Sequence, residues 1–225
     1  MPLLNPVWSA LHSHHRDLAL TTESAARYQT DVSPFAALSS PSRRSLQQLS
    51  TLLDPGEAVW LFEEQLPPAP TLAEVDVLPC LQMLLPPDIR LPDTAGDPPL
   101  LTLTAADTPD MLALIDLAYP GFFRAGTPRM GRFFGVRVAG QLVSMGGERF
   151  RMDGFSEITA LCTHPDHRGH GYATRILWTL AALHRQQDVR SFLHVGASNR
   201  SAHQLYQQLG FSTIAECTLR SLRRL

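Results

Sequence analysis

The sequence contains no lysine: all 19 of its basic residues are arginines, against 21 acidic residues in 225. Exclusive use of arginine can reflect bidentate phosphate binding, but codon bias in a GC-rich genome produces it too, and we favour codon bias. Long apolar runs are also missing, which argues against a membrane-spanning helix. The first residues lack the basic start and long apolar centre of a secretory signal, so we expect a cytoplasmic protein that makes no membrane contact.

Cysteine is scarce and its positions form no motif. Cys80, Cys162 and Cys217 lie far apart, with no CxxC pair. Neither a disulfide framework nor a thiolate zinc site is indicated, and we expect buried, reduced thiols. The net charge of -2 and the lack of a recognition element argue against a nucleic-acid partner.

Proline, glycine and charge are distributed unevenly along the chain. Residues 1–100 hold 14 of the 18 prolines and carry 5 arginines against 12 acidic residues, whereas residues 101–225 hold 12 of the 14 glycines and carry 14 arginines against 9 acidic residues. The second part therefore has the charge to bind an anion. Residues 86–99, rich in Pro and Asp, are typical of a connector. We expect an N-terminal α/β accessory domain at 1–92 and a second domain at 93–225.

Hydrophobic periodicity predicts regular elements in both parts. In the first part these are helices at 6–29 and 42–53, a strand at 57–64 and an apolar segment at 75–85. In the second part they are a helix at 108–119, strands at 132–140, 141–151 and 155–164, a helix at 171–187, a strand at 191–198, a helix at 199–210 and a strand at 212–222. This order predicts an α+β fold with a mixed β-sheet flanked by helices.

The segment HPDHRGHGYA, residues 164–173, carries the clearest chemical signal. Its three histidines at a spacing of three raise the possibility of a metal site. However, Gly169 and Gly171 precede a predicted helix, whose first N–H groups are unpaired and carry the positive end of the helix dipole. Arg168 adds a charge-assisted donor. We therefore favour an anion site that suits a pyrophosphate, and we expect no metal.

Two motifs in this order resemble the GNAT superfamily of N-acetyltransferases. Arg168, Gly171 and Ala173 fill its acyl-CoA signature of Gln or Arg, two residues, Gly, one residue, then Gly or Ala. The later pattern Asn-x-x-Ala-x-x-Leu-Tyr-x-x-Leu-Gly-Phe is matched from Asn199 to Phe211. The resemblance covers about residues 101–225 and is greatest to the branch that includes glycine N-acyltransferase-like members. In such a branch the first domain can be a degenerate copy of the same fold.

The resemblance implies direct transfer of acetyl from acetyl-CoA to an amine. Strand residues 157–163 would open a splay in the sheet, so that backbone groups pair with the pantetheine arm. The residues expected to bind acetyl-CoA are Leu161, Cys162, Thr163, Arg168, Gly169, His170, Gly171, Tyr172, Ala173, Thr174 and Asn199.

The resemblance also implies two catalytic roles. Glu157 is the candidate base that deprotonates the amine, with Glu148 in reserve, and Tyr206 would protonate or stabilise the departing thiolate. Strand alternation predicts that Glu157, Thr159 and Leu161 share one face, while Ile158, Ala160 and Cys162 point the other way. Cys162 is therefore expected to be a core thiol rather than a nucleophile.

The resemblance also predicts where the acceptor amine lies. By analogy with the family, Tyr119, Phe122, Phe123 and Arg124 would form part of its wall, and the acceptor would be a small-molecule or peptide amine. Two alternatives stay open: an N-acyltransferase that uses another acyl-CoA on an amino acid, and a non-catalytic acyl-CoA-binding sensor. We expect a monomer or homodimer.

Overall fold

The computed structural model describes residues 2–92, 100–118 and 121–225. Its helices are α1 (Pro6–Leu11), α2 (Arg43–Thr51), α3 (Thr108–Ala118), α4 (Tyr172–Gln186) and α5 (Arg200–Gln208). Its strands are β1 (Ala19–Thr21), β2 (Ala25–Tyr28), β3 (Ala36–Leu38), β4 (Ala58–Phe62), β5 (Leu72–Leu84), β6 (Leu101–Leu103), β7 (Phe133–Val138), β8 (Gln141–Met152), β9 (Phe155–Thr163), β10 (Arg190–Gly196) and β11 (Ser212–Arg224).

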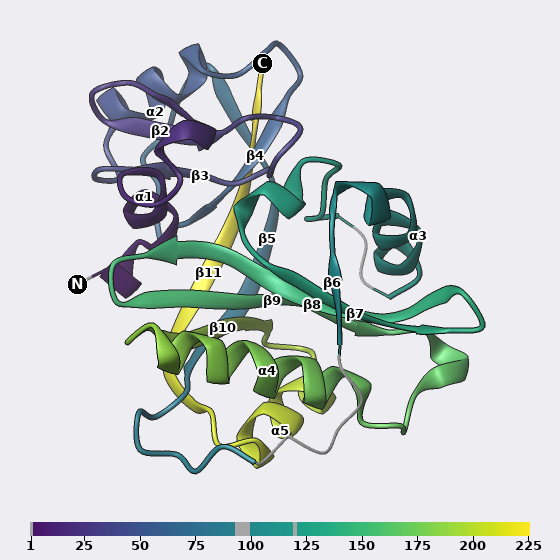
Figure 1. The fold of residues 1–225 in the computed structure, drawn as a ribbon. Helices are drawn as coiled ribbons and strands as arrows, with labels where there is room; N and C mark the ends of the chain where they lie inside the picture. The colour runs from purple at the N-terminus through teal and green to yellow at the C-terminus, as the bar shows by residue number, and fades with distance from the viewer. Residues whose placement is uncertain (1, 93–99, 119–120) are drawn as a thin grey trace.

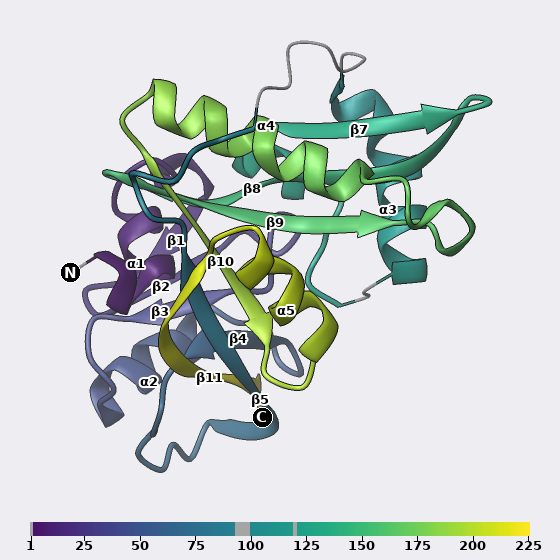
Figure 2. The ribbon, with the colours of Figure 1, turned by 90° about the horizontal axis from the view of Figure 1, so that it is seen from below.

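An eight-stranded mixed sheet forms the centre of the described part of the chain. Its strand order is β4-β11-β5-β10-β9-β8-β7-β6, and only the β9–β10 pairing is parallel. A second, three-stranded sheet has the order β1-β2-β3. α1, α2 and the small sheet lie on one side of the large sheet, and α4 and α5 on the other (Figures 1 and 2). This arrangement confirms the predicted α+β fold with a mixed sheet flanked by helices.

The large sheet joins strands from both parts of the chain. β5 lies between β10 and β11, so that Cys80 is paired with Gly196 on one side and with Cys217 on the other. β4 pairs with the outer side of β11. The predicted domain boundary between residues 92 and 93 stays a prediction. The large sheet contains strands from both sides of this boundary.

The predicted helix at 6–29 is wrong beyond its first turns. Asn5 caps α1 by accepting from the Trp8 N–H, but the helix ends at Leu11, and β1 and β2 follow. β2 is buried throughout, and its Arg27 makes a bidentate ion pair with Glu57. Tertiary contacts of this kind override the helix propensity of its two alanines. The other predicted elements are present with shifted ends.

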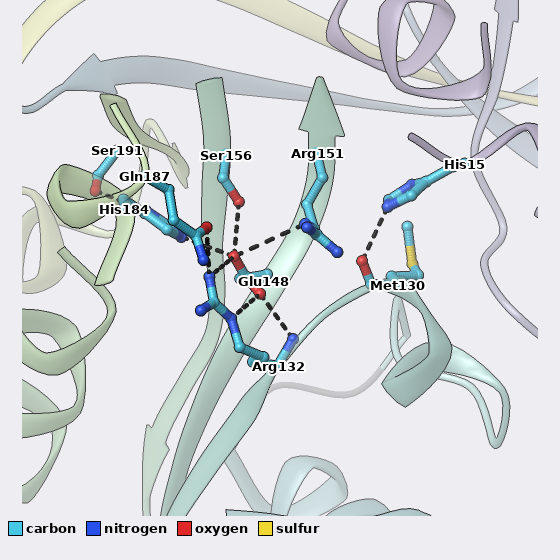
Figure 3. Close-up of polar contacts among 9 residues, drawn as sticks. All are labelled: His15, Met130, Arg132, Glu148, Arg151, Ser156, His184, Gln187 and Ser191. Carbon is cyan, nitrogen blue, oxygen red and sulfur yellow. Dashed lines mark hydrogen bonds and ion pairs between the residues drawn. The ribbon is translucent and has the colours of Figure 1, made fainter. Parts of the chain in front are cut away.

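A buried histidine links the first part of the chain to the second. The Tyr28 hydroxyl donates to His15 Nδ1 (2.8 Å), and Nε2 donates to the Met130 carbonyl (2.9 Å), as Figure 3 shows for the second contact. Burial lowers the pKa of His15 to about 4. The ring is therefore neutral at pH 7, which suits one acceptor and one donor nitrogen.

Candidate active site

β9 and β10 separate in the middle of the large sheet. Their pairing covers only Phe155–Glu157 against Arg190–Phe192, and the register that the structure describes goes no further. A cavity of about 860 Å³ lies at this opening. Its lining combines residues next to α4 and α5 with residues on the opposite side of the sheet, including Phe35 and Phe122. The cavity therefore links the two sides of the sheet.

The strand β9 contains a bulge that changes its side-chain alternation. Ala160 has a φ of 52°, and the β8–β9 register shifts between Thr159 and Cys162. As a result, Leu161 packs in the same cluster as Ile158, under α4, whereas Cys162 packs with α3 on the other face. The predicted parity was wrong for Leu161, which shares a face with Ile158, and for Cys162, which does not, because a bulge adds one residue that simple alternation cannot anticipate.

The loop before α4 has the geometry of an anion cradle. Gly169 and Gly171 have φ values of 80° and 73°, and no atom lies within 4 Å of a Cβ built at either position. α4 starts directly after Gly171 without a side-chain cap. Its first N–H groups therefore face open space at the positive end of the helix dipole. The exposed Arg168 has no ion pair among the described residues, so its guanidinium is available to an anion.

The three histidines of this loop make local contacts. His164 Nδ1 accepts from the Asp166 N–H (3.3 Å), and His170 Nδ1 lies 3.1 Å from the His167 carbonyl. The His170 ring also stacks on Tyr172. Within residues 2–92, 100–118 and 121–225, no three His, Cys, Asp or Glu side chains are placed to hold a metal ion.

Asn199 and Tyr206 both line the cavity. The Asn199 side-chain oxygen accepts from the Ala202 N–H (3.1 Å) and from the Ser201 hydroxyl (3.1 Å), so only its amide NH₂ is free to bind a ligand. Burial raises the pKa of Tyr206 to about 12. Its hydroxyl has no hydrogen-bond partner in the described part of the chain, which leaves a protonated donor in the cavity.

Glu157 lies at the point where β9 and β10 separate. Its side chain is fully buried and accepts from Arg149 Nε and Nη2 at 2.7 Å each and from His194 Nδ1 at 2.7 Å. Burial alone would raise the pKa of Glu157, but the charge and hydrogen bonds of Arg149, together with His194, outweigh it and lower the pKa to about 2. The carboxylate is therefore ionised. Its two partners, Arg149 and His194, line the cavity.

Glu148, the reserve base, belongs to a separate buried cluster (Figure 3). Arg132 donates to both carboxylate oxygens, and His184 and Ser156 donate to Oε1. Burial would raise the pKa of Glu148, but the His184 and Arg132 hydrogen bonds hold it well below its usual range. The described lining of the cavity does not include Glu148. The structure therefore does not bring it to the other predicted site residues.

The other predicted binding residues largely meet at the cavity. Those that line it are Leu161, Cys162, Thr163, Arg168, Gly169, His170, Gly171, Tyr172, Ala173, Thr174, Phe122 and Phe123. Tyr119 lies outside the described residues. The Arg124 guanidinium donates to the carbonyls of Gly121 and Phe123 and is not part of the lining.

The cavity residues that the sequence prediction missed include Phe35, Arg149 and His194. Arg149 and His194 lie on strands, as polar residues in largely apolar surroundings. A polar residue within a buried strand is a signal that could have identified His194. Phe35 could not be found in this way, because it is distant in sequence and reaches the cavity only through the fold.

The cysteines differ in their surroundings. Burial raises the pKa of Cys162 to about 12, which suits a core thiol and does not favour a nucleophile. Cys80 and Cys217 are opposite each other on β5 and β11, with their sulfur atoms 2.9 Å apart, and all three thiols are free. The hydrogen bond between Cys217 and Cys80, together with burial, raises the pKa of Cys217 well above its usual range.

No described helix is long and apolar enough to span a membrane.

Comparison with known proteins agrees with this geometry. The family model described as FR47-like protein matches residues 134–220. A protein from Novosphingobium aromaticivorans, assigned to the GNAT family of acetyltransferases, is 33% identical, with a TM-score of 0.90 over 100% of this chain and 99% of that chain. A GCN5-related N-acetyltransferase from Kribbella flavida is 18% identical, with a TM-score of 0.62 over 97% of this chain and 93% of that one. No curated protein sequence matches the chain.

The similarity to the Novosphingobium aromaticivorans protein extends over the whole chain, including β1–β5, and not only over the two sequence motifs. It therefore covers the divided sheet, the loop before α4 and the residues that line the cavity. The chain therefore belongs to the GNAT superfamily of N-acetyltransferases.

Proposed function

We propose that the protein transfers an acetyl group from acetyl-CoA to a primary amine by direct attack in a ternary complex. One observation carries the proposal. A single cavity connects the anion cradle before α4, the free hydroxyl of Tyr206 and the partners of Glu157 on the far side of the sheet. An acyl donor and an amine can therefore meet where β9 and β10 separate.

The residues of the cradle suit the pyrophosphate of acetyl-CoA. Gly169 and Gly171 leave room for close approach to the backbone, and Arg168 supplies a charge-assisted donor. The edge of Leu161–Thr163 that faces β10 is unpaired in the described register, so it can pair with the amides of the pantetheine arm as an added strand would. The Asn199 NH₂ group can bind the same arm.

We infer that the Glu157–His194 pair accepts the proton that the amine loses on attack. Glu157 holds Nδ1–H, which leaves His194 Nε2 as the accepting nitrogen, and the carboxylate stabilises the imidazolium that forms. Gln82 Nε2 now donates to this nitrogen (3.1 Å). The same Gln82 nitrogen also donates to the Leu3 carbonyl (3.0 Å), so the amine must displace Gln82 from His194 Nε2 before it can donate its proton there.

Tyr206 is proposed to stabilise the departing thiolate. As the new C–N bond forms and the C–S bond breaks, the electron pair goes to sulfur. A phenol with a pKa of about 12 is a weaker acid than a thiol, whose pKa is roughly 8.5. Tyr206 is therefore expected to hydrogen-bond to the thiolate rather than to transfer its proton completely.

The test is thiol release from acetyl-CoA in the presence of a panel of primary amines. We expect amine-dependent release by the wild type and a fall in kcat of roughly 10²-fold in Glu157→Gln. Circular dichroism would show that the variant is folded. If the wild type binds acetyl-CoA but no amine stimulates release, the protein is a sensor and the proposal fails.

Charge reversal tests the cradle separately. Arg168→Glu should weaken acetyl-CoA binding by more than about 1.5 kcal/mol, the lower end for a hydrogen bond to a charged group. Arg185→Glu, an exposed position at the other end of α4 and outside the cavity, is the matched control. Equal affinity for Arg168→Glu and wild type in calorimetry would show that the pyrophosphate lies elsewhere.

A further inference from the structure

The cavity has an acceptor half, defined here as the part lined by Phe35, Leu78, Phe122, Arg149 and His194. Its wall is mainly apolar. The described lining of the whole cavity contains no Asp or Glu. The carboxylate of Glu157, behind this wall, is already bound by Arg149 and His194. A second positive charge on the acceptor would therefore be desolvated without a partner, which disfavours polyamines and lysine-rich peptides.

Arg149 is held in a fixed position with one nitrogen unused. Its guanidinium carbon lies 4.6 Å from the centroid of the Phe35 ring and 4.5 Å from that of Phe150, and Nε and Nη2 both donate to Glu157. Because the guanidinium is planar, Nη1 points away from that carboxylate. Within the described residues Nη1 has no hydrogen-bond partner. A fixed donor that lines a cavity is suited to a ligand acceptor group.

The two cavity-lining partners of Glu157 are immediate neighbours. Arg149 Nη2 and His194 Nδ1 both bind the same oxygen, Glu157 Oε1, at 2.7 Å each. The unused donor of Arg149 is Nη1, and the nitrogen of His194 that does not bind Glu157 is Nε2. A carboxylate bound by Arg149 would therefore lie in the same half of the cavity as His194, with the acceptor side chain against the apolar wall.

We propose that Arg149 binds the carboxylate of the acceptor, so that the acceptor is a free amino acid with an apolar or aromatic side chain. This inference rests on the proposed acetyltransferase function. It assigns a specificity role to an arginine that the two family motifs do not contain.

The first test needs no variant. Thiol release from acetyl-CoA by the wild type is measured with L-phenylalanine, with L-phenylalanine amide and with phenethylamine, which share the side chain and differ at the carboxylate. We expect kcat/KM for L-phenylalanine to exceed kcat/KM for the amide and for phenethylamine by about 10-fold or more. Both of these compounds lack the carboxylate and so lose one charge-assisted hydrogen bond. Equal or better use of phenethylamine would overturn the inference while leaving the acetyltransferase function intact. Release with none of many amines would instead overturn the function itself.

The second test asks whether Arg149 is the residue responsible. Arg149→Lys keeps a positive charge next to Glu157 but loses the donor fork. We expect KM for the amino acid to rise about 10-fold, KM for acetyl-CoA to stay constant, and the preference over phenethylamine to shrink. Arg137→Lys is the matched control, since Arg137 is paired with Asp107 outside the cavity. An unchanged preference in a folded Arg149→Lys would place the carboxylate elsewhere.

Discussion

Two buried glutamates of the same sheet differ in their connection to the cavity, because their partners differ. Glu157 is held by Arg149 and His194, and both of these line the cavity. Glu148 is held by Arg132 and His184, which lie outside it. Both carboxylates are ionised, because each keeps a lowered pKa despite its burial. Glu157 is therefore connected to the cavity by its neighbours, and not by its own carboxylate.

Tyr206 offers a clean test of catalysis at the level of one atom. Tyr206→Phe removes a hydroxyl that has no partner among the described residues and keeps the ring that packs near Phe211. We expect kcat to fall by roughly 10²-fold, with little change in KM for acetyl-CoA. The free energy of unfolding should change by less than about 0.5 kcal/mol. An unchanged kcat at saturating amine would show that Tyr206 serves packing alone.

Single residues were predictable from the sequence where a motif fixes them. Arg168, Gly171 and Asn199 belong to local patterns, and the structure places all of them at one cavity. Arg149 and His194 belong to no motif. Their position at the cavity depends on the pairing register of β8, β9 and β10, which cannot be predicted from a single sequence.

At the scale of elements, the first turn of α4 depends on backbone conformation. Gly171→Ala would force a side chain into the left-handed region at a φ of 73°, at a cost of roughly 1 kcal/mol in stability. Gly154→Ala is a matched control, with a φ of 74°, equally open surroundings and a position outside the cavity. We expect both variants to lose similar stability, but only Gly171→Ala to bind acetyl-CoA more weakly. Equal acetyl-CoA affinities in calorimetry would contradict the cradle.

Elements of the second part were predicted well because their periodicity and their local turns agree. The helix at 171–187 and the strands at 132–140 and 141–151 are found nearly as expected. The failure at 6–29 has a different cause. β1 and β2 are short, and they are stabilised by burial against distant residues and by the pair between Arg27 and Glu57. Local secondary-structure propensity does not depend on such distant contacts, so it could not predict these strands.

At the scale of the whole molecule, acid should weaken the link between the two parts of the chain. The pKa of His15 is lowered from 6.5 to about 4, so its contribution to stability is complete above pH 6.5 and is lost as the pH falls to about 4. We expect a loss of up to about 3 kcal/mol in the free energy of unfolding over this range. Urea unfolding at several pH values would measure it.

The matched variant for this test is His15→Gln, which can keep one donor and one acceptor without titrating. Its stability should vary less between pH 6.5 and 4 than that of the wild type. An equal slope in both proteins would assign the acid sensitivity to other groups. Below pH 4.5 both proteins should weaken further, because the pKa of Glu157 is about 2 in the folded state.

The position of β11 between β4 and β5 has a consequence for biosynthesis. The ribosome makes β4 and β5 long before β11, yet these two strands are not neighbours and each needs β11 as its partner. Until then, their edges are exposed and open to incorrect pairing. Such late, distant contacts slow folding and prolong the exposure of nascent strands. The speed of translation and the supply of chaperones should therefore affect the yield of this protein more than that of a protein whose sheet forms in chain order.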